Sequence, residues 1–212
     1  MKIALIGATG FIGSQLLQEA VQRGHQVTAL VQHPEKVPAL PGVHAQAIDV
    51  LDTAALTQAL RGHELVISAF SGHAQADVLG YFLQGFQSIL SAAKAAAAPR
   101  LLVVGGAGSL EVAPGVNLLD SPQFPAEWKA SAEGARQALS LLRAEAELDW
   151  TLLSPAAMLA PGERTGNFRL GGDQLLTDAQ GQSRISVADY AVAMLDEMER
   201  PAHRRQRFSV AY

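Results

Sequence analysis

The sequence predicts one α/β domain with a mostly parallel, doubly wound sheet that has helices on both faces. Three observations lead to this prediction. Short apolar runs alternate with longer segments of helical periodicity, 49% of the residues are hydrophobic, and 212 residues suit a single large domain better than two. Continuous apolar runs are typical of strands buried on both faces, and strands that alternate with helices favour parallel pairing through right-handed crossovers.

The elements follow one another in this alternating order along the chain. We expect strands at residues 2–6, 26–31, 45–48, 65–70, 101–104 and 150–153. Between them we expect helices at residues 11–23, 53–61, 78–98 and about 127–147, where apolar residues recur at intervals of three and four.

The last third of the sequence is less regular. Residues 161–166 and 171–173 are rich in turn formers, and 178–182 predicts a hairpin or loop. A last helix is expected at about 187–199, after the candidate N-cap Ser186, and a closing strand at 207–211. No linker divides the chain, so we expect one domain over residues 1–212. The substrate side of its crevice would come from about 155–212.

Composition argues against several classes of protein. The chain has 16 basic and 20 acidic residues and no basic run longer than Arg204–Arg205, so nucleic acid is not an expected partner. No apolar segment reaches the roughly 20 residues that a membrane span needs, and the first apolar run has the form of a strand rather than a signal peptide. With no cysteine, the sequence suits a reducing compartment. We therefore expect a cytoplasmic protein, either a monomer or a homodimer.

The strongest motif is Gly7–Gly13, a G-x-x-G-x-x-G run that follows the first strand and opens a helix. In this context Gly7 permits a tight turn, Gly10 lets the backbone approach a pyrophosphate, and Gly13 allows close packing of helix on strand. The alternative is a glycine turn that binds nothing. The context favours a Rossmann-type dinucleotide site, with candidate contacts from Gly7, Thr9, Gly10, Phe11, Ile12 and Gly13.

The next two strand ends are expected to contact the adenosine half of the cofactor. Sites specific for NAD carry an acidic residue after the second strand, whereas this chain has Gln32 and His33 there. The missing carboxylate favours NADP, but the missing arginine leaves NAD open. Asp49 and Val50 follow the third strand, where adenine is expected, although Asp49 could equally cap the following turn.

These motifs resemble the atypical branch of the short-chain dehydrogenase/reductase superfamily. That branch includes NAD(P)H-binding proteins related to flavin reductases, biliverdin reductase B and the NmrA-like regulators. The similarity spans nearly the whole chain and is strongest to bacterial NADH-flavin reductases. It implies a Rossmann fold, a nicotinamide cofactor and a reductase activity. It is carried by residues 7–13, 24–31, 34, 36, 49–52, 103–109, 150–155, 161–166, 185–191 and 208–211.

The chain departs from this superfamily in two places. Gln32 stands where many relatives carry arginine, which leaves the preference for NADP undecided. The tyrosine that classical members place four residues before a lysine is also missing, because Pro125 precedes Lys129 at that spacing. Reactions that need the tyrosine proton are therefore disfavoured. Reduction of a flavin or quinone survives, because such planar acceptors take hydride onto ring atoms and a proton from water.

The remaining candidates lie after the fourth, fifth and sixth strands, whose carboxyl ends share one crevice. Ser109 could orient a carbonyl group or be an ordinary turn residue, and Lys129 could bind ribose or phosphate or be solvated. Trp128 and Phe124 could stack on a flat acceptor or pack on the core, and His73 lies near the crevice. No metal site is indicated. The other expected cofactor contacts are Ala69, Phe70, Ser71 and Pro155.

Two functions remain open from the sequence. The first is an NAD(P)H-dependent oxidoreductase acting on a flavin, a quinone or a similar small planar acceptor. The second is a dinucleotide-binding sensor without turnover, like the NmrA-like regulators. The missing tyrosine weakens the first, while the short chain leaves little room for the partner-binding region of the second. We favour the enzyme.

Overall fold

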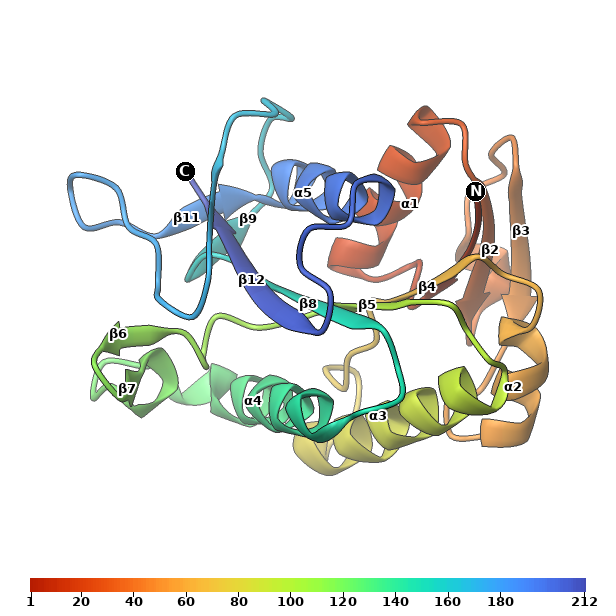
Figure 1. The fold of residues 1–212 in the computed structure, drawn as a ribbon, viewed down its shortest axis with the longest axis horizontal. Helices are drawn as coiled ribbons and strands as arrows, with labels where there is room; N and C mark the ends of the chain where they lie inside the picture. Colours follow the sequence, from red (N-terminus) through yellow and green to blue (C-terminus); the bar gives the residue numbers. More distant parts are fainter.

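The computed structural model describes residues 1–212 and contains an eight-stranded sheet between two layers of helices (Figure 1). The strands lie in the order β10-β12-β8-β5-β4-β1-β2-β3, and every neighbouring pair is parallel except β10 and β12. The predicted doubly wound, mostly parallel fold is therefore confirmed. The strands are β1 (Lys2–Ile6), β2 (Gln26–Val31), β3 (Val43–Ala47), β4 (Leu65–Ser68), β5 (Leu101–Val104), β8 (Trp150–Ser154), β10 (Arg169–Gly171) and β12 (Gln206–Ala211).

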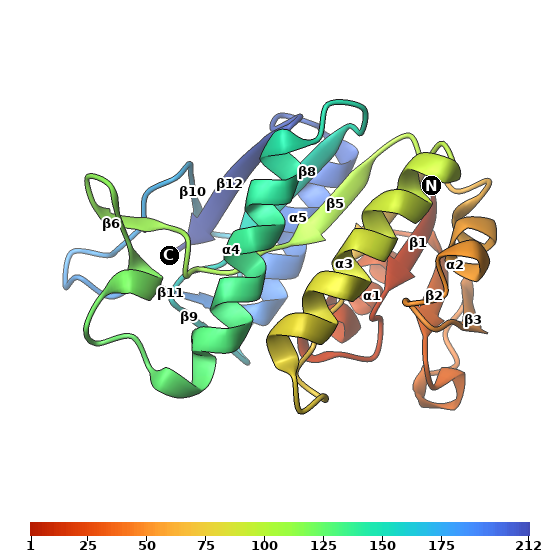
Figure 2. The ribbon, with the colours of Figure 1, turned by 90° about the horizontal axis from the view of Figure 1, so that it is seen from below.

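The helices divide between the two faces of this sheet. In Figure 1, α1 (Phe11–Gln22) and α5 (Val187–Glu199) lie above the sheet. The helices α2 (Thr53–Leu60), α3 (Val78–Ala95) and α4 (Lys129–Ala144) lie below it, and Figure 2 shows α3 and α4 in front of the sheet from that side. Each face therefore encloses its own apolar core.

Alternation along each strand supplies both cores. In β1, Ile3 and Leu5 join the core beneath α1 and α5, whereas Ala4 and Ile6 join the core against α2, α3 and α4. All four side chains are at most 1% exposed. Because successive side chains point to opposite faces, a strand covered on both sides must be apolar throughout.

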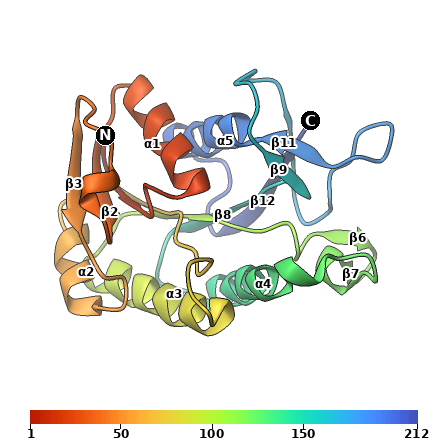
Figure 3. The same cartoon turned by 180° about the vertical axis from the view of Figure 1, so that it is seen from behind.

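Several short elements lie in the segments that follow the carboxyl ends of the central strands. Two small two-stranded sheets form there, β6 (Glu111–Ala113) with β7 (Val116–Asn117), and β9 (Met158–Ala160) with β11 (Arg184–Ser186). Figure 3 shows β9 and β11 beside α5, and β6 and β7 beyond the end of α4. Three 3-10 turns complete the chain, at Pro34–Lys36, Leu118–Asp120 and Ala126–Trp128.

Most predicted elements match, and their ends differ for physical reasons. The fourth strand ends at Ser68 rather than at residue 70, because its partner β1 ends at Ile6, opposite Ser68. The third helix ends at Ala95 rather than at residue 98. Ala97 adopts a positive φ of 51°, and Pro99 disfavours helical geometry in the residue before it. The third strand begins earlier, at Val43, and the short strands β6, β7, β9, β10 and β11 were not predicted.

The order of the strands reverses direction at β1. From β1 the chain proceeds outward through β2 to β3, then returns to β4 on the other side of β1 and continues outward through β5 and β8. In open α/β sheets, ligands bind at the carboxyl ends of the strands where the order reverses. The segment that follows β1 therefore lies where a ligand is expected to bind.

None of the helices has both the length and the apolar character that a membrane span requires.

Candidate dinucleotide site

The glycine-rich turn is wedged between the ends of β2 and β4. Gly7 has a φ of 78°, and its N–H donates to the Leu30 carbonyl at 3.0 Å. A Cβ at Gly7 would lie 2.6 Å from the Ala69 carbonyl oxygen. Both the positive φ and the lack of space require glycine at this position. The turn therefore begins at the end of β1, between the ends of the two strands that flank β1 in the sheet.

The first turn of α1 presents unpaired N–H groups at this place. Gly10 is the N-cap, and no side chain caps the helix. The first helix-type bond runs from the Ser14 N–H to the Gly10 carbonyl at 2.9 Å, so the N–H groups of residues 11–13 have no protein partner. Thr9, Gly10 and Phe11 are exposed. Free amides and the positive end of the helix dipole suit a phosphate group.

Gly13 allows α1 to begin this close to the turn. A Cβ on Gly13 would lie only 2.0 Å from the Gly7 carbonyl oxygen, whereas a Cβ on Gly10 would have that oxygen at 3.3 Å as its nearest neighbour. Gly13 is thus required by packing, while Gly10 leaves an open approach to the backbone. These residues fit the pyrophosphate of a dinucleotide in the way the sequence predicted.

The end of β2 carries no carboxylate at the position expected to contact ribose. Gln32 is held by a hydrogen bond from its Nε2 to the Tyr81 hydroxyl at 3.2 Å. His33 is exposed, and its Nδ1 lies 3.1 Å from a carboxylate oxygen of the equally exposed Glu35. The predicted contacts of Gln32 and His33 with a cofactor stay predictions.

Asp49 caps the turn after β3. Its Oδ1 accepts the Leu51 N–H at 2.9 Å, so the capping interpretation from the sequence holds. Its side chain is nevertheless exposed, and the second carboxylate oxygen has no protein partner, so contact with adenine remains compatible. The Val50 side chain, in contrast, is buried in the core, and the Val50 carbonyl oxygen accepts a hydrogen bond from the Ser88 hydroxyl at 2.6 Å.

Residues after β4 line the other side of the turn. The Ala69 carbonyl faces Gly7, and Ser71 is exposed. Phe70 stacks on Phe82 with ring centroids 5.9 Å apart, and its ring also lies beside Tyr81. Pro155, the predicted contact after β8, is buried. Phe70 thus belongs mainly to an aromatic stack on α3.

Two aromatic groups meet at the other end of this region. The His73 ring, in the loop after β4, packs against the edge of the Trp128 ring with centroids 6.1 Å apart. Trp128 precedes α4 and is 52% exposed, so it is not a core residue, and this exposure supports the stacking interpretation over the core-packing one. Phe124 is half-buried.

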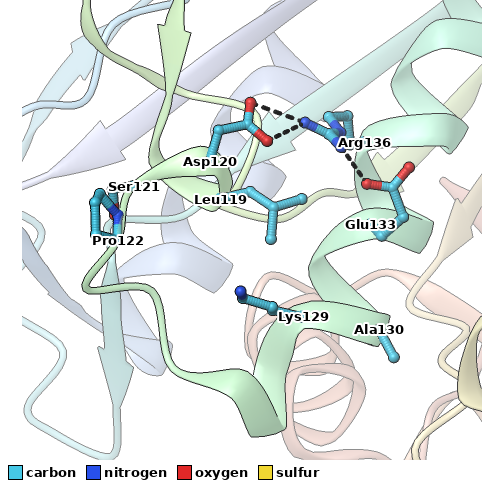
Figure 4. Close-up of a pocket in the computed structure, with 8 residues that line it drawn as sticks. All are labelled: Leu119, Asp120, Ser121, Pro122, Lys129, Ala130, Glu133 and Arg136. Carbon is cyan, nitrogen blue, oxygen red and sulfur yellow. Dashed lines mark hydrogen bonds and ion pairs between the residues drawn. The ribbon is translucent and has the colours of Figure 1, made fainter.

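The fold places the segments that carry Ser109 and Lys129 close together, but the two residues do not contact each other. Gly108, next to Ser109, faces Leu119 and Ala132, three residues beyond Lys129. Lys129 is exposed and lines a hollow of about 560 Å³ with Leu119 and Pro122, where Figure 4 shows its side chain directed into the open space. The Arg136 side chain in this hollow is paired with Asp120 and Glu133, whereas Lys129 has no ion-pair partner.

The hollow contains no residue of the glycine-rich turn. A ribose contact from Lys129 therefore stays a prediction.

The sequence analysis missed one residue of this region, Arg207. Its guanidinium reaches Ser109 from β12, and its side chain is only 2% exposed. Burial lowers the pKa of Arg207, and the neighbouring Asp173 carboxylate opposes that shift. The sequence offered no clear signal for this contact, because 98 residues separate Arg207 from Ser109.

Residues 161–166, one of the segments that carry the resemblance, contact both α1 and α5. We call this segment the clamp. Arg164 pairs with the buried Glu19 at 2.8 Å, and this hydrogen bond, more than any other interaction, lowers the pKa of Glu19. The Asp189 carboxylate accepts the N–H groups of Thr165 and Gly166 at 2.8 and 2.7 Å. The segment therefore fixes the helix that carries the glycine-rich turn.

A family model described as "NAD(P)H-binding" matches residues 7–198, which begins at the first glycine of the turn. The chain belongs to this NAD(P)H-binding family. The match covers the glycine-rich turn, both helix layers and six strands of the central sheet. The predicted resemblance to NAD(P)H-binding proteins is confirmed.

Solved structures agree on the fold and differ in their descriptions. A "putative exported protein" from Burkholderia pseudomallei is 45% identical with a TM-score of 0.91, and each chain covers 100% of the other. A "putative epimerase" from Bacteroides thetaiotaomicron is 42% identical, with a TM-score of 0.93 over 100% of this chain and 96% of its own. A "putative NADH-flavin reductase" from Streptococcus pneumoniae is 36% identical, with a TM-score of 0.89 over 100% and 99%. The three structures thus share the fold, whereas their descriptions name no common activity.

Proposed function

We propose that the protein is an NAD(P)H-dependent oxidoreductase that reduces a flavin, a quinone or a similar planar acceptor. The observation that carries this proposal is the open backbone at Gly10 beside the unpaired N–H groups of residues 11–13. In a member of the NAD(P)H-binding family, that arrangement is best explained by the pyrophosphate of a dinucleotide. The neighbour described as an NADH-flavin reductase supports the same reaction class.

The residues around the crevice suit a flat substrate. A bound nicotinamide would supply a hydride, and the chain has to hold the acceptor beside it and keep water away. Trp128 and Phe11 are 52% and 53% exposed, so both rings are available to stack on a ligand. Both lie at the start of a helix, α4 and α1 respectively. Exposed rings at these positions are compatible with stacking on a planar acceptor.

Two of the three tyrosine hydroxyls already donate their hydrogen within the protein, which supports an acceptor that needs no tyrosine proton. The Tyr190 hydroxyl is fully buried and donates to the Leu153 carbonyl at 2.8 Å, and burial raises its pKa far above the ordinary value. The Tyr212 hydroxyl donates to Asp189 at 2.8 Å, and the Tyr81 hydroxyl receives the Gln32 amide. A flavin or quinone can take its proton from water instead.

The experiment is a steady-state assay of NADPH and NADH oxidation with FMN, riboflavin and menadione as acceptors. We expect saturable oxidation with at least one acceptor, and its loss in the Gly10→Val variant, whose new side chain would stand in the place of the pyrophosphate. Tight cofactor binding by the wild-type protein without oxidation by any acceptor would contradict the reductase and favour a dinucleotide sensor.

A further inference from the structure

A buried polar cluster lies between β12, β8 and the segment after β5. Nε of Arg207 donates to Asp173 at 2.7 Å, and Nη2 of Arg207 donates to the same carboxylate. The third nitrogen, Nη1, lies 3.4 Å from the Ser109 hydroxyl and 3.4 Å from the Ser154 hydroxyl. Ser209, opposite Ser154 in the parallel ladder, adds another buried hydroxyl that has no partner in the protein. The Ser209 hydroxyl is therefore a buried polar group whose hydrogen bond the protein does not supply.

The hydrogen bond from Arg207 determines which way the Ser109 hydroxyl can act. A guanidinium only donates hydrogen bonds, so the Ser109 oxygen must accept. Arg207 is the only protein partner of this oxygen. The hydroxyl hydrogen of Ser109 therefore points away from Arg207 and is free to donate to another acceptor.

Only one of the two serines bonded to Arg207 is accessible to solvent. Ser154 is 0% exposed, whereas Ser109 is half-buried at the end of the glycine-rich segment after β5. The carboxyl ends of β5 and β4 face the crevice where the order of the strands reverses. Ser109 is thus the member of the cluster that can reach a molecule bound there.

We propose that Arg207 is a positioning residue that makes the Ser109 hydroxyl a hydrogen-bond donor to a ring carbonyl oxygen of the planar acceptor. This inference rests on the proposed function and narrows its substrate to conjugated ring systems that carry a carbonyl group, such as isoalloxazines and quinones. The carbonyl oxygen gains electron density as the ring takes up hydride, so a donor at this position strengthens as the reaction proceeds.

Asp173 holds Arg207 in the geometry that this role needs. Its Oδ1 binds Arg207 and also accepts from Arg143 at 2.9 Å. Arg143 is 55% exposed and touches neither serine, so it shares the carboxylate but not the proposed role. Arg143 therefore provides a matched control for loss of a positive charge beside Asp173.

The test is acceptor affinity, measured by quenching of riboflavin fluorescence in protein saturated with NADP⁺, a mixture in which no turnover occurs. Four variants are compared with the wild type: Ser109→Ala, Arg207→Met, the double variant and Arg143→Met. We expect Ser109→Ala and Arg207→Met each to weaken riboflavin binding about fivefold to tenfold, the value of about one hydrogen bond. The double variant should bind no more weakly than Ser109→Ala alone, because Arg207 acts through Ser109. Arg143→Met and the NADPH affinity of all variants should be unchanged.

Several outcomes would overturn the inference. These are wild-type riboflavin affinity in Arg207→Met, a double variant in which the two losses multiply, an equal loss in Arg143→Met, or no riboflavin binding by the wild type. If Arg207→Met does not fold, Arg207→Lys retains the charge but cannot span Asp173 and Ser109 together, so the same weakening is expected. A wild type that binds riboflavin but never oxidises NADPH would end the proposed function while leaving this inference intact.

Discussion

At the scale of single residues, the glycines of the turn have different tasks that the motif alone does not separate. The sequence predicted their joint role from the strand before them and the helix after them. The structure shows that a Cβ would meet backbone at 2.0 Å on Gly13 and at 3.3 Å on Gly10. Packing therefore requires glycine at position 13, whereas the exposed backbone at Gly10 is the place where we propose that the ligand approaches.

Replacement of Gly13 by alanine should destabilise the fold. The new Cβ meets the Gly7 carbonyl, which belongs to the backbone and cannot move cheaply. We expect a loss of about 3 kcal/mol in the free energy of unfolding, or a fall in Tm of roughly 6–12 °C. Gly10→Ala, the control, should lose less than about 1 kcal/mol. Equal thermal stability of the two variants would contradict this distinction.

Residue 32 should set the preference between NADP and NAD. Gln32→Arg places a guanidinium where a 2′-phosphate is expected, so the ratio of NADPH to NADH affinity should rise by about tenfold, the value of a charge-assisted hydrogen bond. Tyr81→Phe removes the present partner of Gln32 without adding charge and should leave the ratio nearly unchanged. Fluorescence titration with both nucleotides measures the ratio. An unaltered ratio in Gln32→Arg would place the ribose elsewhere.

At the scale of elements, local sequence predicted where most helices and strands lie, but not how their ends are fixed. The N-cap Ser186 was predicted, and its hydroxyl accepts the Asp189 N–H at 3.0 Å. The Ser186 hydroxyl also donates to the Glu163 carbonyl at 2.8 Å. This contact could not be predicted, because it joins segments 23 residues apart. The short strands β6, β7, β9 and β10 likewise depend on tertiary partners more than on β-propensity.

Removal of the Asp189 charge should loosen the segment 161–166. In Asp189→Asn the side chain loses half of its acceptor capacity, while the N–H groups of Thr165 and Gly166 stay in place. We expect a loss of about 1–3 kcal/mol in stability and faster hydrogen exchange at both amides. Glu163→Gln changes an exposed carboxylate in the same segment and should alter neither. Unchanged exchange at residues 165 and 166 would refute the clamp.

At the scale of the whole molecule, composition and periodicity were enough to predict two helix layers on a parallel sheet. The strand order, and its reversal at β1, came only from the structure. The long-range polar contacts were beyond such reasoning. The buried Arg100 donates to Glu197 across 97 residues, and Arg207 meets Ser109 across 98. Periodicity reports which face a residue occupies, but not which distant side chain shares that face.

Stability should fall on acidification. Burial raises the pKa of Asp189 and of Glu197, but the hydrogen bonds each carboxylate accepts outweigh burial and lower both pKa values; the hydrogen bond from Arg164 lowers that of Glu19. A carboxyl whose pKa is lower in the folded chain binds its proton first in the unfolded chain. Its stabilisation is present above the unfolded pKa of about 4 and is lost as the pH falls through the folded value.

Urea denaturation at a series of pH values from 7 to 3 measures this change. The free energy of unfolding should decrease below about pH 4. A constant or rising value over that range would contradict the pKa directions of these three carboxylates.

The most direct test of the central claim is a fluorescence titration of NADPH with the wild type and with Gly10→Val, in parallel with their Tm values. We expect saturable NADPH binding by the wild type. We also expect loss of binding in the variant at nearly unchanged Tm, because Gly10 is exposed and lies outside the core. NADPH binding by Gly10→Val as tight as that of the wild type would show that the glycine-rich turn is not the dinucleotide site.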